Sequence, residues 1–264
     1  MTYIIFFIVC FGASIVGAIC GIGGGVIIKP VLDSFGILSV TAISFLSGCT
    51  VLSMTTYSVI RNRLDRGGKA SGAGDRTRLP LALGAAAGGL IGKEIFSYVK
   101  SLSEDPDRVG AVQAACLLVV TVGTLIYTIY KARIRTHQVE NTAVSVLIGL
   151  FLGMISSFLG IGGGPINLVV LFYFFSITTK QAAEVSLYII FFSQAASLIS
   201  TIVTGSVPSV EISLLLLMVA GGILGGVCGR HINKRIDEKT VDKLFIGLMV
   251  AMILINIYNI WKYM

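Results

Sequence analysis

The sequence predicts an all-α polytopic membrane protein made of two inverted repeats, each with a glycine-broken helix pair and about three further transmembrane helices. Three observations predict this class. Hydrophobic residues make up 55% of the chain and charged residues only 12%, whereas soluble domains carry about 25% charged residues. The run Gly-Ile-Gly-Gly-Gly occurs at residues 21–25 and again 139 positions later, at 160–164. Basic residues are concentrated in alternate loops, as the positive-inside rule expects.

The first half contains five apolar stretches, at about residues 3–20, 26–38, 41–60, 79–99 and 109–130. The second stretch follows the glycines directly and has 13 residues. A helix of that length reaches only about 20 Å, short of the ~30 Å hydrocarbon core, so we predict a half-length helix. Two arrangements fit: a short spanning helix, or a re-entrant hairpin with the glycines at its tip, which the short segment favours.

The second half repeats this plan, with apolar stretches at about residues 144–159, 165–177, 182–204, 212–229 and 241–261. The match extends beyond the glycines, because Ser47 and Ser186 share the 139-residue offset and the glycine-rich run 88–93 resembles 225–230. A basic linker joins the halves. We therefore predict one integral membrane domain with a first repeat at 1–134 and a second at 135–264.

The distribution of positive charge predicts the orientation. Six, three and five basic residues lie in loops 61–78, 131–135 and 230–243, against two and none in loops 99–108 and 205–211. The first three loops are therefore predicted to be cytoplasmic. Segment 79–99 then starts inside while its counterpart 212–229 ends inside, so the halves are inverted relative to each other. We expect a multi-pass protein of the cell (inner) membrane with both termini outside.

The repeated glycines are the predicted substrate site. Irregular backbone inside a membrane persists only where protein buries it or where it lines a polar cavity. Glycines that precede a helix expose unpaired backbone N–H groups at its positive end, which is an anion-binding arrangement. The predicted binding residues are Gly23, Gly24, Gly25, Gly162, Gly163 and Gly164. Close helix packing by small residues is the alternative.

Polar residues near the glycines extend the predicted substrate site. Asn167 lies one turn inside the second short helix, and Ser47 and Ser186 lie early in the helices that follow. The alternative for both serines is a hydrogen bond to their own helix backbone. Lys29, four residues after the first glycine run, either faces the anion or pairs with Asp33 at i+4.

Glu184 is the predicted coupling residue, and Asp33 is a second candidate. A buried carboxylate can carry a coupling proton near neutral pH. The alternatives for Glu184 are an interfacial carboxylate and a partner for Lys29. The expected partners are a small anion, the lipid bilayer, and a coupling proton or cation. A homo-oligomer is left open, because lipid-facing and dimer-facing surfaces have similar compositions.

Several other classes of protein are excluded. The only histidines, His137 and His231, fall in predicted cytoplasmic loops, so neither a metal cluster nor a Ser–His pair is expected within the membrane. We predict no cofactor, no metal site and no enzymatic activity. The five cysteines lack CxxC spacing and fit helix packing. The net charge of +7 is explained by the basic loops, so nucleic acid is not an expected partner.

The glycine run with its downstream Pro30, the repeat at 160–165, and the run Ala183-Glu184-Val185-Ser186 resemble the sulfite exporter TauE/SafE family, a group of four-TMS sulfonate and sulfite permeases. The resemblance covers essentially the whole chain. It implies a permease for small sulfur-containing or organic anions such as sulfite, sulfonates, sulfoacetate or thiosulfate, coupled to an ion gradient. Val169 stands where the first copy has its proline, and Pro165 follows the second glycines directly. Unequal half-sites are therefore expected.

Two transport mechanisms fit these residues. A secondary transporter working by alternating access is favoured, because inverted repeats with broken helices are typical of such carriers. The alternative is an anion channel that uses the same glycine pocket as a filter.

Overall fold

The computed structural model describes residues 2–65, 73–102, 106–161 and 163–263. Its described residues form helices and connecting segments, with no strand among them, which confirms the all-α prediction. The first half comprises α1 (Thr2–Cys20), α2 (Gly25–Phe35), α3 (Val40–Asp65), α4 (Ala73–Leu102), α5 (Pro106–Tyr130) and the 3₁₀ turn η1 (Lys131–Arg133). The second half comprises α6 (Thr142–Phe158), α7 (Pro165–Phe175), α8 (Thr179–Val203), α9 (Ile212–Asn233) and α10 (Glu238–Tyr263).

Seven described helices are long and apolar enough to cross a membrane, namely α1, α3, α4, α5, α8, α9 and α10. The second helix of each half is short, since α2 and α7 have 11 residues each and therefore reach only about 16 Å. The half-length helix predicted after the first glycines is thus present, and it ends at Gly36, which adopts the left-handed conformation at the C-cap. Several long helices also continue past their apolar stretch into the basic loops, as α3 does to Asp65.

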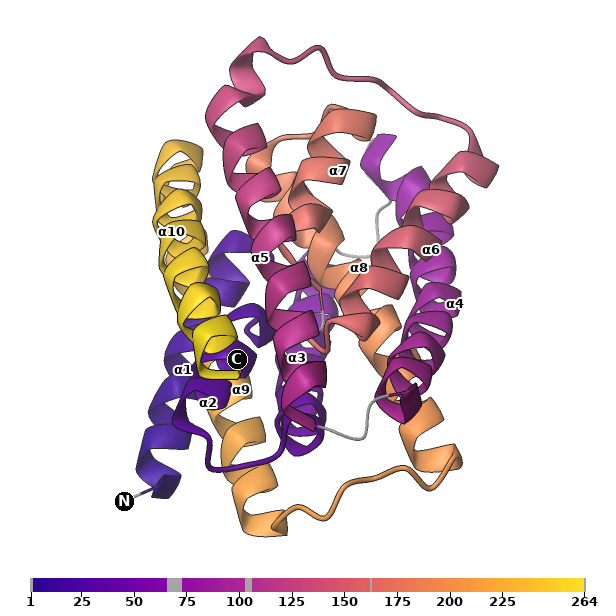
Figure 1. The fold of residues 1–264 in the computed structure, drawn as a ribbon. Coiled ribbons are helices and arrows are strands. Elements are labelled where there is room, and N and C mark those ends of the chain that lie inside the picture. The colour runs from indigo at the N-terminus through magenta and orange to yellow at the C-terminus, as the bar shows by residue number, and fades with distance from the viewer. Residues whose placement is uncertain (1, 66–72, 103–105, 162, 264) are drawn as a thin grey trace.

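Figure 1 shows that each glycine run joins two helices into a hairpin. The outer ends of α1 and α2 lie in the lower half of the view, where the N-terminus also lies, whereas the outer ends of α6 and α7 lie at the upper end. Hydrogen bonds agree with this placement, because Lys262 near the C-terminus donates to the carbonyls of Asp33 and Ser34 at the end of α2. The two hairpins therefore enter the molecule from opposite ends.

The halves are interleaved rather than packed as two separate bundles. Helix α4 packs along α6 and α1 along α9, while α3 contacts both α8 and α9 and α10 contacts α5 and α2. Glycines permit the closest of these approaches. A Cβ at Gly88 of α4 would lie 2.0 Å from the carbonyl oxygen of Leu150 in α6, and one at Gly225 of α9 would lie 2.4 Å from that of Phe11 in α1. The two glycine-rich runs that resemble each other in sequence thus serve helix packing.

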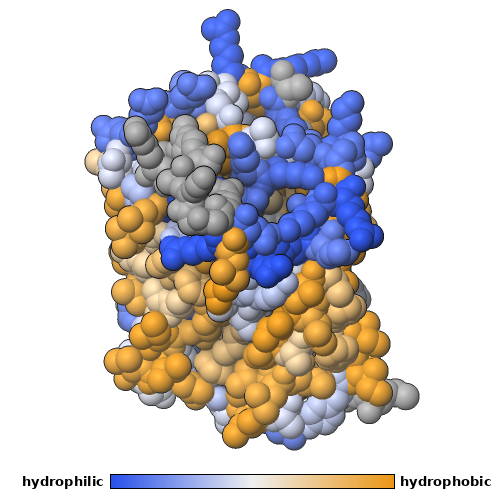
Figure 2. Space-filling view, turned by 180° about the vertical axis from the view of Figure 1, so that it is seen from behind, coloured by the Kyte–Doolittle hydropathy of each residue, from blue (hydrophilic) through white to orange (hydrophobic). Residues whose placement is uncertain are grey.

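Polar side chains gather at one end of the molecule. Figure 2 shows hydrophilic residues at the upper end and an apolar surface below it. This upper end is where α3, α5 and α9 finish and where the linker between the halves crosses. We call it the basic end, because the predicted cytoplasmic loops converge there. The linker is fixed to the second hairpin by bonds from His137 N to Tyr173 O and from Val139 N to Phe174 O.

Candidate functional site

Both glycine runs break the chain in the same way. Gly21 and Gly23 have φ of 73° and 74°, and Gly160 and Gly163 have φ of 64° and 133°. These backbone conformations are open to glycine and costly for other residues. Each break then leads into a short helix, with Gly24 as the N-cap of α2 and Gly164 as the N-cap of α7, where Pro165 occupies the first turn. Gly162 lies outside the described residues.

The two breaks touch each other. A Cβ added to Gly25 would lie 2.1 Å from the carbonyl oxygen of Ile161 and 2.7 Å from its carbon. Only a glycine hydrogen therefore fits between the start of α2 and the second break. The described residues of this contact are buried, with Ile22 at 0% and Ile161 at 1% exposure. The two glycine runs, which are offset by 139 positions in the sequence, thus form one central structure.

Helices α3 and α8 support this central contact with equivalent residues. In α3, a Val51 methyl group lies 3.5 Å from a Cβ placed on Gly23 and 3.0 Å from a Cβ placed on Gly25. In α8, Ile190 lies 3.4 Å from the same Cβ on Gly23 and 2.2 Å from a Cβ placed on Gly163. Neither Val51 nor Ile190 was predicted from the sequence. They share the 139-residue offset of the glycines, so the internal repeat contains the signal that would find them.

Several polar residues predicted for the site are buried and incompletely hydrogen-bonded. Asn167 Nδ2 donates to Ser186 Oγ over 3.3 Å, and both residues are 0% exposed. Among the described residues, Asn167 Oδ1, Ser47 Oγ and Ser14 Oγ are buried without a hydrogen-bond partner. Buried polar groups in native proteins nearly always have partners, so these three atoms mark places where a ligand or water is expected.

The alternative considered for Ser47 and Ser186 was a hydrogen bond to their own helix backbone, and neither hydroxyl group makes one among the described residues. Neighbouring threonines do bond their own helix, as Thr50 Oγ1 donates to Leu46 O over 2.9 Å. Ser47 makes no such bond within the described residues, and the contact recorded for Ser186 is with Asn167. Ser14, which the sequence analysis missed, approaches the first break from α1, with its Oγ 3.1 Å from a Cβ placed on Gly24.

Lys29 reaches the other half of the molecule. Its ammonium group donates to Leu159 O over 2.9 Å and also to Gln113 Oε1, whose amide in turn donates to Phe158 O over 2.8 Å. Lys29 is 3% exposed. A cation is favourable at this position, because the carbonyls at a helix C-terminus carry partial negative charge. The end of α6, directly before the second break, is therefore capped by residues of the first half.

This arrangement differs from the local pairing considered for Lys29. Its recorded hydrogen bonds go to Gln113 and Leu159, and Asp33 Oδ1 is buried with no hydrogen-bond partner in the described part of the chain. Glu184 forms an ion pair with Arg78 at 3.5 Å, and its side chain is 36% exposed. That exposure fits the interfacial alternative for Glu184.

Comparison with known proteins identifies the fold and the class of function. A family model described as "Sulfite exporter TauE/SafE" matches residues 6–255. The chain belongs to this family. It is therefore a multi-pass membrane transporter and not an enzyme, as the sequence predicted. The described residues contain no group of three or more potential metal ligands.

Relatives of this TauE/SafE protein are distant in sequence. The probable membrane transporter protein YunE of Bacillus subtilis is 22% identical over an alignment of 288 positions, which covers 99% of this chain and 98% of the relative. The probable membrane transporter protein MamO of Paramagnetospirillum magneticum is 26% identical over 120 positions, covering 44% of this chain and 19% of the relative. No solved structure matches significantly.

Proposed function

We propose that this TauE/SafE transporter moves small sulfur-containing or organic anions of the sulfite, sulfonate, sulfoacetate or thiosulfate class by alternating access. The anion binds where the two glycine breaks meet. One observation carries this proposal: Gly25 lies in backbone contact with Ile161, so the N-terminal ends of both short helices belong to one buried structure. Backbone N–H groups at helix N-termini, together with the helix dipoles, favour a negative ligand there.

Unpartnered polar atoms support an anion at this place. The buried hydroxyl groups of Ser14 and Ser47 can each donate one hydrogen bond, and Ser14 approaches the first break from α1. Asn167 and Ser186 approach the second break from α7 and α8. In this proposal the glycines Gly23, Gly24, Gly25, Gly162, Gly163 and Gly164 let the anion approach the backbone closely. Lys29 then acts by capping α6 and holding the second break in position.

The same geometry supports an inverted arrangement of the halves. The two hairpins enter from opposite ends, and the closest packings between the halves have counterparts, as α1 on α9 corresponds to α6 on α4 and α3 on α9 to α8 on α4. We infer that the repeats at 1–134 and 135–264 exchange roles between an inward-open and an outward-open state. With the basic end in the cytoplasm, both termini lie outside the cell membrane.

A carrier explains the burial of the site better than a channel does. Gly23, Gly25 and Gly163 are buried, so an anion reaches them only if the surrounding helices move. Coupling to a proton or cation is assigned to Glu184 or Asp33. Of the two, Asp33 is the more enclosed at 7% exposure.

Thermal stabilisation of the purified protein tests this proposal. Sulfite, sulfate, thiosulfate, sulfoacetate, taurine, acetate and chloride are compared, because a ligand at a hundred times its Kd adds about 2.7 kcal/mol to the stability of the folded state. Stabilisation by a sulfur anion that is lost in Gly163→Val supports the site. The matched control is Gly123→Val, since no atom lies within 4 Å of a Cβ at that position. Stabilisation retained in a folded Gly163→Val protein, or given by none of these anions, contradicts the proposed site.

A further inference from the structure

A small cavity at the basic end of the molecule borders the first glycine break. Its volume is about 60 Å³, compared with the roughly 10–15 Å³ that a single buried water needs. It lies between the ends of α1, α3, α8 and α9 and is lined by Ala18, Ser58, Asn62, Lys180, Ala183, Glu184, Leu187, Arg230, Asn233 and Lys234. Three of these side chains are basic and one is acidic. The cavity is therefore suited to an anion.

Two contacts show that this cavity borders the first break. Ala183 lines it, and the Cα of Ala183 lies 2.2 Å from a Cβ placed on Gly21. Asn233 also lines it and donates from Nδ2 to Ile19 O over 2.6 Å at the end of α1. An anion in this cavity would be separated from the first break only by the residues that begin it.

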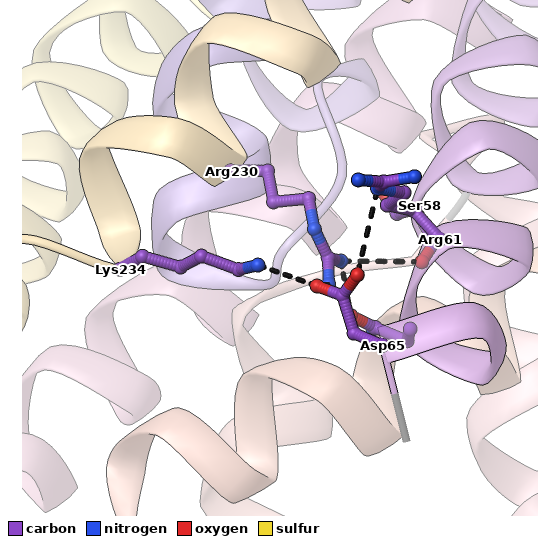
Figure 3. A network of polar contacts seen from close by, with 6 residues as sticks. Ser58, Arg61, Asp65, Arg230 and Lys234 are labelled. Atoms are coloured by element: carbon purple, nitrogen blue, oxygen red, sulfur yellow. Dashed lines mark hydrogen bonds and ion pairs between the residues drawn. The ribbon is translucent and has the colours of Figure 1, made fainter. Parts of the chain in front are cut away.

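Arg230 is the most constrained of the basic residues around the cavity. Its guanidinium donates to Ser58 O over 3.4 Å, to Asn62 Oδ1, and to Asp65 Oδ2 over 3.0 Å (Figure 3). Its side chain is 15% exposed. Arg230 Nε is buried and has no acceptor among the described residues. The guanidinium therefore retains a donor that a ligand can satisfy.

One carboxylate serves three cations at this place. Asp65 Oδ2 accepts from both Arg230 and Lys234, and Asp65 Oδ1 forms an ion pair with Arg61 at 3.5 Å (Figure 3). Three positive charges against one negative charge leave the cluster with an excess of two. Helices α3 and α9 already pack closely through glycine, since a Cβ at Gly222 would lie 2.9 Å from Thr50 O. A cluster that served only to join these two helices would not need the excess positive charge.

We propose that Arg230 and Lys234 form an access site for the transported anion at the basic end, and that Asp65 occupies this site when no anion is present. An oxyanion offers the guanidinium the same paired oxygens as a carboxylate. When the anion replaces Asp65, the carboxylate keeps its partner Arg61 one helical turn away. Excess positive charge in a recess also raises the local anion concentration. This inference rests on the proposed function and adds the residues that select the substrate before it reaches the glycine breaks.

Transport measured separately from the two faces of reconstituted vesicles tests this access site, with sulfite and sulfoacetate as probes. Arg230→Gln is expected to raise KM about tenfold at one face only, because a hydrogen-bonded charge is lost. Asp65→Asn is expected to lower KM at that same face by about threefold, because a competing anion is removed. Lys239→Gln removes an exposed basic residue near the start of α10 and is the matched control, expected to leave both KM values unchanged.

The opposite signs of the two effects are the decisive result. If Asp65→Asn raises KM as Arg230→Gln does, or if both variants change KM equally at the two faces, the cluster is structural and the access site is wrong, while the proposed function stands. If wild-type vesicles transport neither these probes nor thiosulfate or another sulfonate, the proposed function fails and the access site fails with it. Should Arg230→Gln not fold, Lys234→Gln takes its place, since that side chain is 57% exposed and its loss is tolerated more easily.

Discussion

Replacing Gly25 by alanine should separate the two glycine breaks. The new Cβ would lie 2.1 Å from Ile161 O, and ordinary contact begins at 3.4 Å, so the two backbones must move apart by about 1.3 Å. Backbone atoms cannot rotate out of the way as a side chain can. Overpacking of this kind costs about 1–3 kcal/mol, which corresponds to a fall in Tm of about 2–12 °C for a chain of this size.

The effect on anion binding should exceed the effect on stability. A displacement of about 1 Å at a site that depends on geometry can reduce function a hundredfold, so we expect stabilisation by the anion to vanish in Gly25→Ala even when the protein is folded. Tm with and without the stabilising anion measures both effects. Gly12→Ala of α1 is the matched control, because no atom lies within 4 Å of a Cβ at that position. A Gly25→Ala protein that melts and binds as wild type would refute the contact between the breaks as the basis of the site.

Three further predictions concern the polar residues. Lys29→Met should lower the free energy of unfolding by about 1–3 kcal/mol, and with it Tm, because the buried carbonyl of Leu159 loses its donor. Reduced anion affinity at unchanged Tm would instead make Lys29 a direct ligand. Ser47→Ala should leave Tm unchanged or raised, since its buried hydroxyl has no partner in the described protein, and should weaken anion binding measured by stabilisation; unchanged binding would remove Ser47 from the site. Glu184→Gln should abolish gradient-driven accumulation in vesicles while anion exchange persists, and the coupling role is excluded if both activities survive.

The two half-sites are not chemically equal. Asn167 of α7 corresponds by the 139-residue offset to Ile28 of α2, so the amide–hydroxyl pair with Ser186 has no equivalent beside Ser47. The caps before the breaks differ as well. Asn233, a neutral amide, caps Ile19 in the first hairpin, whereas Lys29 caps Leu159 in the second. If an anion binds between the breaks as proposed, it would meet the Asn167 amide in the second half and no equivalent amide in the first, which would give it a preferred orientation.

The sequence was informative about features that depend on neighbouring residues. Composition and apolar run length predicted the membrane-spanning helices, because the hydrocarbon core fixes both. The glycine runs predicted the chain breaks, and Pro165 predicted the start of α7, because both residues act through their own backbone. Boundaries at charged ends were less accurate. Helix α3 runs to Asp65 rather than to about residue 60, since hydrogen bonding continues a helix beyond the point where apolar residues end.

By itself, then, the sequence determined the helical membrane fold, the repeated pair of breaks and the residues at their edges. Only the tertiary structure decided how these pieces meet. The contact of Gly25 with Ile161, the capping of Leu159 by Lys29 and the binding of Arg230 to Asp65 each join residues more than 100 positions apart. Whether such residues meet depends on how long helices pack and rotate against one another. Packing is set by the summed contacts of whole helix faces, and no local pattern in one chain segment contains that information.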